Sequence, residues 1–264
     1  EVGAGKLFWE KDPSPRTFMA PYPWRSSWQS DIDLTGEERP QSVYRQIMWG
    51  DAGRSGIYTT HPRHYGESFT GYGWHWQDVR DSWTFDDEYL GKPVQTEVYG
   101  AGDEAEFLLN GRSLGRVPFE KLKAEMDIPY EPGLLEAVVL KDGRKISRCS
   151  LKTAGKMAAL MVVPEDAWIA ADGRDLGYLR ITAVDAKGTR CVEEECQVTV
   201  QVEGGGSFVS MGSGNPCTED QITETVCHLW RGTAIVIVKG MTPGQIRVTV
   251  RAKDISGKGV LEAR

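Results

Sequence analysis

The sequence predicts a mostly β protein, in which two β-sandwich domains follow an irregular segment with a single helix. Short runs rich in Val, Ile and Leu, several of them alternating with polar residues, are typical of strands. Turn-forming pairs such as Asn110-Gly111 and Asp142-Gly143 separate these runs as they do in hairpins. One stretch, residues 40–49, has the apolar spacing of a helix. We therefore expect sheets to form most of the core.

Residues 1–56 form the first segment, and they do not look like a domain by themselves. The segment is rich in aromatic residues, Pro and Arg. Pro40 suits a first helical position, and Val43 and Ile47, with the aromatic Tyr44 and Trp49, would give the helix a buried stripe. About forty irregular residues before a single helix are uncommon in a compact domain. We interpret the segment as part of something larger.

Residues 57–155 are expected to form a small β-sandwich. The pair Asn110-Gly111 favours a tight two-residue hairpin, because both of its positions need positive φ. The pairs Pro132-Gly133 and Asp142-Gly143 predict further turns. The strands are expected at residues 93–99, 104–109, 123–128, 134–141 and 145–153.

Residues 156–264 are expected to form an immunoglobulin-like β-sandwich. About seven short strands in a hundred-odd residues without a helical period suit that architecture. The Cys pair and core Trp of antibody domains are not at the expected spacing, so the expectation concerns architecture alone. The clearest strand candidates are residues 159–163, 177–185, 197–203, 233–239 and 245–252.

Composition excludes several classes of partner. The formal net charge is -7 and the Lys and Arg residues form no basic run, so we expect no nucleic-acid partner. No apolar stretch approaches the ~20 residues of a membrane helix, and we expect no membrane partner. The five cysteines are an odd number without a CxxC pair, which argues against a thiolate zinc site and favours reduced, structural thiols. These thiols favour a cytoplasmic location, although the chain opens on Glu1 rather than Met and says nothing about secretion.

The candidate binding residues are Trp24, Arg25 and Trp28, in an aromatic cluster with Tyr22. Aromatic faces stack on pyranose rings, and polar neighbours bind hydroxyl groups. The cluster therefore predicts a sugar contact. The alternative is that these side chains only pack the loop onto the rest of the protein.

Other polar and aromatic groups have structural interpretations. Asp31 and Asp33 precede a turn and a helix, as capping residues or buried acceptors do. His61 and His64 have the spacing of some metal pairs but no third ligand within reach, so we expect neither a metal nor a cofactor. The adjacent Glu37 and Glu38 are expected at a solvated helix start. A second aromatic group is expected to be buried or to form a secondary carbohydrate-binding face, and it consists of Trp74, Trp76 and Trp83.

Residues 21–50 resemble the segment that closes the catalytic (β/α)8 barrel of glycoside hydrolase family 2 β-galactosidases. The resemblance rests on the Asp-Ile-Asp-Leu-Thr-Gly run at residues 31–36 and on the Pro-Gln-Ser that begins at Pro40, followed by Arg45. Residues 91–115 resemble the small β domain that follows the barrel. Residues 169–173 and 184–188 resemble the bacterial immunoglobulin-like domain that ends many of these chains.

The resemblance implies a loop-plus-helix remnant of the barrel before two sandwich domains. Retaining glycosidases use two carboxyl groups, a nucleophile and an acid/base, about 5 Å apart. In the family both glutamates precede anything that matches this sequence, so we expect no catalytic residue here and no activity from the chain alone. Its expected partners are the rest of the parent glycosidase chain and the carbohydrate substrate of the intact enzyme. The alternatives are a carbohydrate-binding module and a purely structural immunoglobulin-like spacer.

Overall fold

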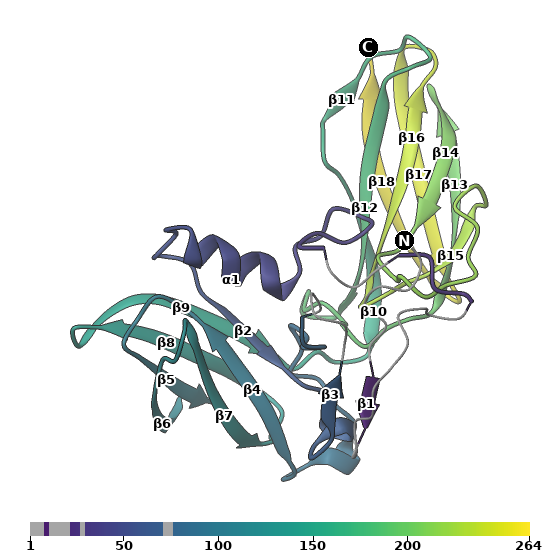
Figure 1. The fold of residues 1–264 in the computed structure, drawn as a ribbon. Coiled ribbons are helices and arrows are strands. Elements are labelled where there is room, and N and C mark those ends of the chain that lie inside the picture. The colour runs from purple at the N-terminus through teal and green to yellow at the C-terminus, as the bar shows by residue number, and fades with distance from the viewer. Residues whose placement is uncertain (1–7, 11–21, 27–29, 71–75) are drawn as a thin grey trace. The chain divides into compact units, whose positions relative to one another are not determined.

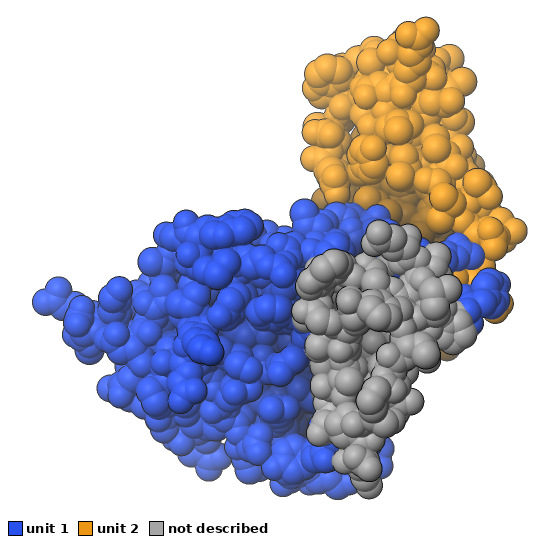
Figure 2. Space-filling model, viewed as in Figure 1, with its two compact units in different colours: residues 1–153 blue, residues 154–264 orange. Residues whose placement is uncertain are grey.

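The chain is a mostly β protein that divides into two compact units, Glu1–Thr153 and Ala154–Arg264 (Figures 1 and 2). The computed structural model describes residues 8–10, 22–26, 30–70 and 76–264. A short antiparallel pair, β1 (Phe8–Glu10) and β3 (Ser68–Thr70), belongs to the first unit.

Helix α1 (Pro40–Met48) is the one α-helix in the described part of the chain, and its position agrees with the sequence prediction. Pro40 occupies the first turn, where its missing N–H would have no partner in the helix anyway. Val43 and Ile47 are buried as expected. Trp49 is not, since the helix ends at Met48 and leaves the Trp49 side chain 75% exposed. The sequence prediction was therefore wrong to include Trp49 in the buried stripe of the helix.

The two larger sheets of the first unit enclose its main apolar core. Residues from both sheets, such as Val98 and Phe107, are fully buried in it together with Trp83 from the connecting segment. Two 3-10 turns, Pro62–His64 and Asp87–Tyr89, lie between strands. One sheet has the order β2 (Gly56–Thr59), β4 (Pro93–Tyr99), β7 (Lys123–Pro129), and the other has the order β6 (Arg112–Pro118), β5 (Glu104–Leu109), β8 (Leu134–Lys141), β9 (Arg144–Lys152).

The predicted hairpin at Asn110-Gly111 and the predicted turn at Asp142-Gly143 are both confirmed. Asn110 and Gly111 have φ values of 53° and 77°, and they join strands that pair Leu109 with Arg112. Asp142 and Gly143 have φ values of 48° and 70° between β8 and β9. Both central residues of each turn are thus left-handed, the geometry whose twist matches that of the flanking strands.

The three-stranded sheet is covered on both faces, and the candidate site lies beside its outer face. Its inner face, with Val94 and Val98, meets the four-stranded sheet. Residues one position along, such as Tyr99, point the other way because side chains alternate across a strand. There Tyr99 packs with Val43 and Ile47 of α1. A strand buried on both faces can hold a polar group away from water.

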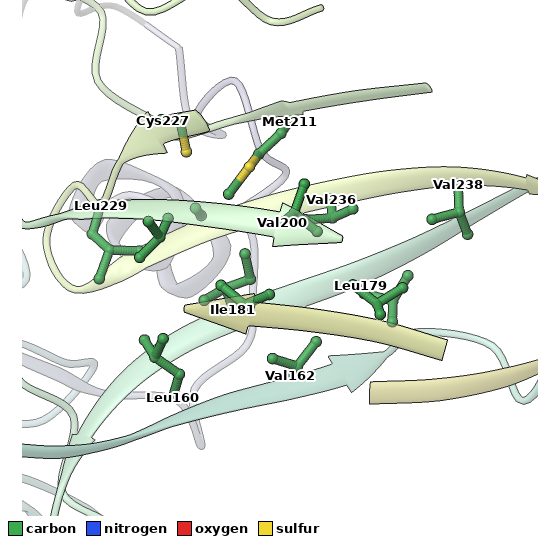
Figure 3. Close-up of a cluster of buried hydrophobic side chains, with 14 of the residues drawn as sticks. Leu160, Val162, Leu179, Ile181, Val200, Met211, Cys227, Leu229, Val236 and Val238 are labelled. Carbon is green, nitrogen blue, oxygen red and sulfur yellow. The ribbon is translucent and has the colours of Figure 1, made fainter. Parts of the chain in front are cut away.

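The second unit also has two sheets around one core, from which Figure 3 shows ten labelled side chains, Leu179 and Val236 among them. The pairing is antiparallel except between β11 and β18. One sheet has the order β10 (Met157–Pro164), β12 (Leu176–Asp185), β16 (Thr233–Gly240), β14 (Gly206–Gly212); the other has the order β11 (Trp168–Ile169), β18 (Ile255–Ala263), β17 (Gly244–Ala252), β13 (Gln197–Gly204), β15 (Val226–His228).

Strand β18 was not anticipated from the sequence, because Gly257 and Gly259 interrupt its apolar pattern. The structure explains both glycines. A Cβ atom at Gly257 would lie 2.0 Å from the Leu160 carbonyl oxygen, and one at Gly259 would lie 2.8 Å from the Val162 carbonyl oxygen. The backbones of β10 and β18 therefore approach closely at positions where a side chain would not fit.

Candidate functional site

A pocket of about 610 Å³ opens beside the outer face of the three-stranded sheet in the first unit. Helix α1 contributes Tyr44, β4 contributes Glu97, and β7 contributes Lys123 and Glu125. The pocket is therefore built by segments that are far apart in sequence. Among the described residues, its lining is Tyr44, Trp76, Gln77, Glu97, Val117, Pro118, Glu120, Lys121, Lys123 and Glu125.

Three aromatic rings lie together at one side of this pocket. The ring centroids of Tyr44 and Trp76 are 5.1 Å apart, and the ring of Tyr99 meets that of Tyr44 edge to face at 5.5 Å. Tyr99 meets Trp76 at 6.0 Å and 89°, and the Trp76 Nε1–H donates to the Tyr99 hydroxyl at 3.1 Å. Edge-to-face pairs of this kind add to the stabilisation from burial. Trp76, which is only partly buried, is thus held in one orientation.

A buried carboxylate ends this hydrogen-bonded chain. Glu97 is 1% exposed, and one of its carboxylate oxygens accepts a hydrogen bond of 2.8 Å from the Tyr99 hydroxyl. Gln77, with its amide nitrogen turned toward Glu97, donates to the same carboxylate. Burial raises the pKa of Glu97, against the opposing effects of the Lys123 charge and the Tyr99 hydrogen bond.

Lys123 joins Glu97 to a more exposed acid on the neighbouring strand. Its Nζ lies 3.7 Å from a Glu97 oxygen and donates to Glu125 at 2.8 Å. Burial acts to lower the pKa of Lys123, but the charges and hydrogen bonds of Glu97 and Glu125 outweigh it, so the pKa is raised. The ammonium group therefore stays charged between the two carboxyl groups.

A turn with unusual backbone geometry forms part of the pocket rim. Lys121 and Leu122 have φ values of 49° and 67°, a region that side chains other than Gly rarely adopt. The Tyr44 hydroxyl donates to the Lys121 carbonyl at 2.5 Å. Leu122 packs, as Tyr44 does, against the buried cluster that includes Val43 and Tyr99. Helix α1 is thus tied to the turn through the Tyr44 hydroxyl.

The pair Glu97 and Glu125 does not have the arrangement of a glycosidase centre. The two residues are opposite each other on β4 and β7, but the Lys123 ammonium contacts both carboxyl groups and occupies the space between them. Glu97 is also closed to solvent. Retaining enzymes need two carboxyl groups that can both reach the scissile bond. This geometry suits binding rather than hydrolysis.

Of the residues predicted to contact sugar, Trp24 and Arg25 do not line this pocket. Trp24 is partly buried and Arg25 is exposed. Trp28 lies outside the described residues. A sugar contact by these residues therefore stays a prediction.

The acidic residues before α1 make local structural contacts, but the expected helix cap is absent, since the N-terminus of α1 has no side-chain cap and no acidic residue in its first turn. Asp33 accepts hydrogen bonds from the backbone N–H groups of Thr35 and Glu37, at 2.7 and 3.0 Å, and so stabilises the turn. Asp31 forms an ion pair with Arg45. Glu38 pairs with Arg54 outside the pocket.

The histidine pair and the second tryptophan group also have structural environments. The Nδ1 atom of His61 accepts from the Arg63 N–H at 3.1 Å, and His64 Nδ1 lies 2.8 Å from Glu67. Burial and the nearby Arg63 lower the pKa of His61 to about 4. Among the described residues, no group of three potential ligands could hold a metal ion. Trp83 is fully buried and Trp76 lines the pocket, while Trp74 lies outside the described residues.

Sequence reasoning missed Glu97 and Lys123 because both occupy positions that alternate with apolar residues in a strand. Such positions usually face water. In β4, Glu97 alternates with Thr96 and Val98 of the core face, and nothing local indicates that α1 will cover the opposite face. The weak signal available was Tyr99, a large aromatic residue on the same face as Glu97.

Comparisons with known proteins match part of each sandwich to a domain family. Residues 160–260 match the glycoside hydrolase family 2 C-terminal domain 5, and residues 91–147 match a domain of unknown function, DUF4982. A crystal structure of a family 2 member from Bacteroides cellulosilyticus superposes on 92% of this chain with a TM-score of 0.85 and 31% identity. The chain comprises C-terminal domains of a family 2 glycoside hydrolase. It covers 32% of that crystallised chain.

Curated relatives of these family 2 domains carry two different activities in their names. A β-galactosidase from Bacteroides ovatus is 24% identical over 243 residues, which are 89% of this chain and 25% of the relative. A putative β-glucuronidase from Formosa agariphila is 29% identical over 138 residues, which are 51% of this chain and 13% of the relative. The chain therefore spans a quarter or less of these two relatives.

In the part of the chain that the structure describes, no helix is long and apolar enough to cross a membrane.

Proposed function

We propose that this chain is the non-catalytic C-terminal region of a retaining β-galactosidase and supports the hydrolysis of terminal β-galactosides by the intact enzyme. The observation that carries the proposal is the extent of the structural likeness. It covers 92% of this chain but 32% of the crystallised family 2 member. Such an enzyme has room outside these domains for a catalytic barrel and both of its carboxyl groups.

The segment around α1 supports a connection to a barrel. Residues 22–26 and 30–49 expose large apolar side chains, including Leu34 at 59% and Trp49 at 75%. Exposed apolar side chains that gather in one segment often mark a surface that another part of a protein covers. We infer that residues 1–56 are the end of the (β/α)8 barrel, and that the preceding barrel elements cover these side chains. On this proposal both sandwiches are immunoglobulin-like supports for the barrel.

The galactoside specificity is supported by the share of this chain that aligns with each curated relative. The β-galactosidase from Bacteroides ovatus aligns with 89% of this chain, and the putative β-glucuronidase from Formosa agariphila aligns with 51%. Within this proposal Trp24, Arg25 and Trp28 line the sugar pocket of the intact enzyme. Barrel enzymes build their active sites from loops at the C-terminal face, where this segment would lie.

Two assays test the proposal. The 264-residue chain should release no nitrophenol from nitrophenyl β-galactoside, and turnover by it would overturn the non-catalytic role. An intact family 2 enzyme that contains these domains should hydrolyse nitrophenyl β-galactoside and be much slower with the β-glucuronide. The opposite preference would overturn the specificity.

The role of the aromatic loop is tested in the same intact enzyme. Trp24→Ala and Arg25→Ala should raise KM for the β-galactoside, because each removes a sugar contact. Trp168→Ala, which truncates a tryptophan that is 52% exposed in the second unit, is the matched control and should leave KM unchanged. An unchanged KM in both loop variants would show that the loop only packs.

A further inference from the structure

We propose that the pocket beside Glu97 and Lys123 binds a neutral pyranose unit of a saccharide. The inference concerns the first unit alone and does not depend on the proposed catalytic partner. It stands on the pocket's size, its aromatic wall and its balance of charges. At about 610 Å³, the pocket falls within the range of small-molecule sites.

Trp76 supplies an aromatic surface that is fixed before a ligand arrives. Its Nε1–H is held by the Tyr99 hydroxyl, and the ring of Tyr44 packs against it at 5.1 Å. The residue is only partly buried, so part of its surface still faces the pocket. A ring that is already ordered loses little conformational entropy when a sugar stacks on it. Trp76 therefore provides the apolar contact of the site.

Lys123 and its partners supply the polar contacts. An ammonium group carries three hydrogen-bond donors. Lys123 donates to Glu125 at 2.8 Å and lies 3.7 Å from Glu97, and these two contacts hold its ammonium group in place. Glu125 is 44% exposed, so its carboxylate is open to hydroxyl donors. Gln77 and Glu120 line the same space with further polar atoms. Donors and acceptors side by side suit hydroxyl groups, which both donate and accept.

The charges select a neutral sugar over an acidic one. The lining carries three carboxyl groups, Glu97, Glu120 and Glu125, against two ammonium groups, Lys121 and Lys123. The charge of Lys123 is already balanced by two carboxyl groups, so toward a sugar it acts as a hydrogen-bond donor and not as a counter-ion for a uronate. A sugar carboxylate in this pocket would also lie close to like charges. The site should therefore discriminate against glucuronides.

Titrations on the 264-residue chain test the proposal. The probes are methyl β-galactopyranoside, methyl β-glucopyranoside, methyl β-mannopyranoside and methyl β-glucuronide, followed by saturation-transfer NMR and calorimetry. We expect at least one neutral glycoside to saturate with a Kd of about 1 mM, and the glucuronide to bind at least about tenfold more weakly. If no neutral glycoside saturates below ~50 mM, or if the glucuronide binds best, the proposal is overturned.

Variants locate the binding. Trp76→Ala should weaken the best neutral glycoside at least about tenfold, whereas Trp76→Phe, which keeps an aromatic face, should lose less. Trp168→Ala in the second unit is the control and should bind as the unchanged chain does. Circular dichroism must show that each variant is folded. Equal affinity in Trp76→Ala and Trp168→Ala would place the sugar elsewhere and overturn the assignment.

Discussion

Tyr99 donates a hydrogen bond of 2.8 Å to Glu97, two residues earlier on the same strand, and both side chains are closed to solvent. The two side chains share a face of β4 because alternate residues of a strand point the same way. Helix α1 helps to bury this face, with Val43 and Ile47 in the same cluster as Tyr99. A carboxyl group in this environment makes the stability of the unit depend on pH.

Glu97→Gln should alter that pH dependence. The pKa of Glu97 is raised above its ordinary value of 4.5, chiefly by burial, so the folded chain holds this proton to higher pH than the unfolded chain. The free energy of unfolding should therefore fall as pH rises from 4.5 through the raised pKa. Glu97→Gln removes this contribution, so its stability relative to the unchanged chain should improve with pH over that window.

Urea denaturation between pH 4 and 7 measures this difference. Glu131→Gln changes a carboxylate that is 56% exposed in the same unit, and it serves as the matched control. A pH-independent difference between Glu97→Gln and the unchanged chain would contradict the prediction. So would an equal effect of Glu131→Gln.

Trp83→Ala should strongly destabilise the first unit. The side chain is 0% exposed, packs against Tyr130 at 5.2 Å between ring centroids, and donates from Nε1 to the Glu131 carbonyl at 2.9 Å. Truncation leaves a large cavity and an unpaired carbonyl, and we expect a loss of about 3–5 kcal/mol in the free energy of unfolding. Chemical denaturation checks this value. Trp168→Ala should change stability by less than about 0.5 kcal/mol, and comparable losses in the two variants would refute the account.

Gly257→Ala should destabilise the second unit. The new Cβ would lie 2.0 Å from the Leu160 carbonyl oxygen, and since that atom belongs to the backbone, β10 and β18 must separate. Overpacking of this kind costs about 1–3 kcal/mol. Gly212→Ala is the control, because its Cβ would meet its nearest neighbour, Ile222, at an ordinary 3.7 Å. Thermal unfolding of both variants measures the difference, and a Gly257→Ala variant as stable as Gly212→Ala would disprove the close approach.

The cysteine thiols should react slowly in the folded chain. Burial raises the pKa of Cys149 and of Cys227 to about 12, and that of Cys191 and of Cys196 to about 11. The reactive thiolate is therefore scarce at pH 8. We expect Ellman's reagent to label these four thiols slowly in buffer and all five cysteines rapidly in guanidinium, with mass spectrometry assigning each site. Rapid labelling of Cys227 in the native chain would contradict its burial.

Local sequence determined the strands and turns that obey simple rules. The strands predicted at residues 93–99 and 134–141 appear with the same bounds as β4 and β8. Asn110-Gly111 forms its hairpin because both positions accept left-handed backbone at little cost. Pro40 begins α1 because a missing N–H costs nothing in the first turn. The family resemblance was also readable, since it rested on runs of residues rather than on contacts.

The tertiary structure decided what the polar residues do. Lys123 and Glu125 look like the solvent face of an alternating strand, and only the packing of α1 and the strand β4 places them beside a buried Glu97. Gly257 looks like an interruption, but pairing with β17 places it in a strand, and the approach of β10 explains why it is glycine. Periodicity reports which residues share a face of one element. It does not report which other element will cover that face, because this depends on contacts between residues that are distant in the sequence.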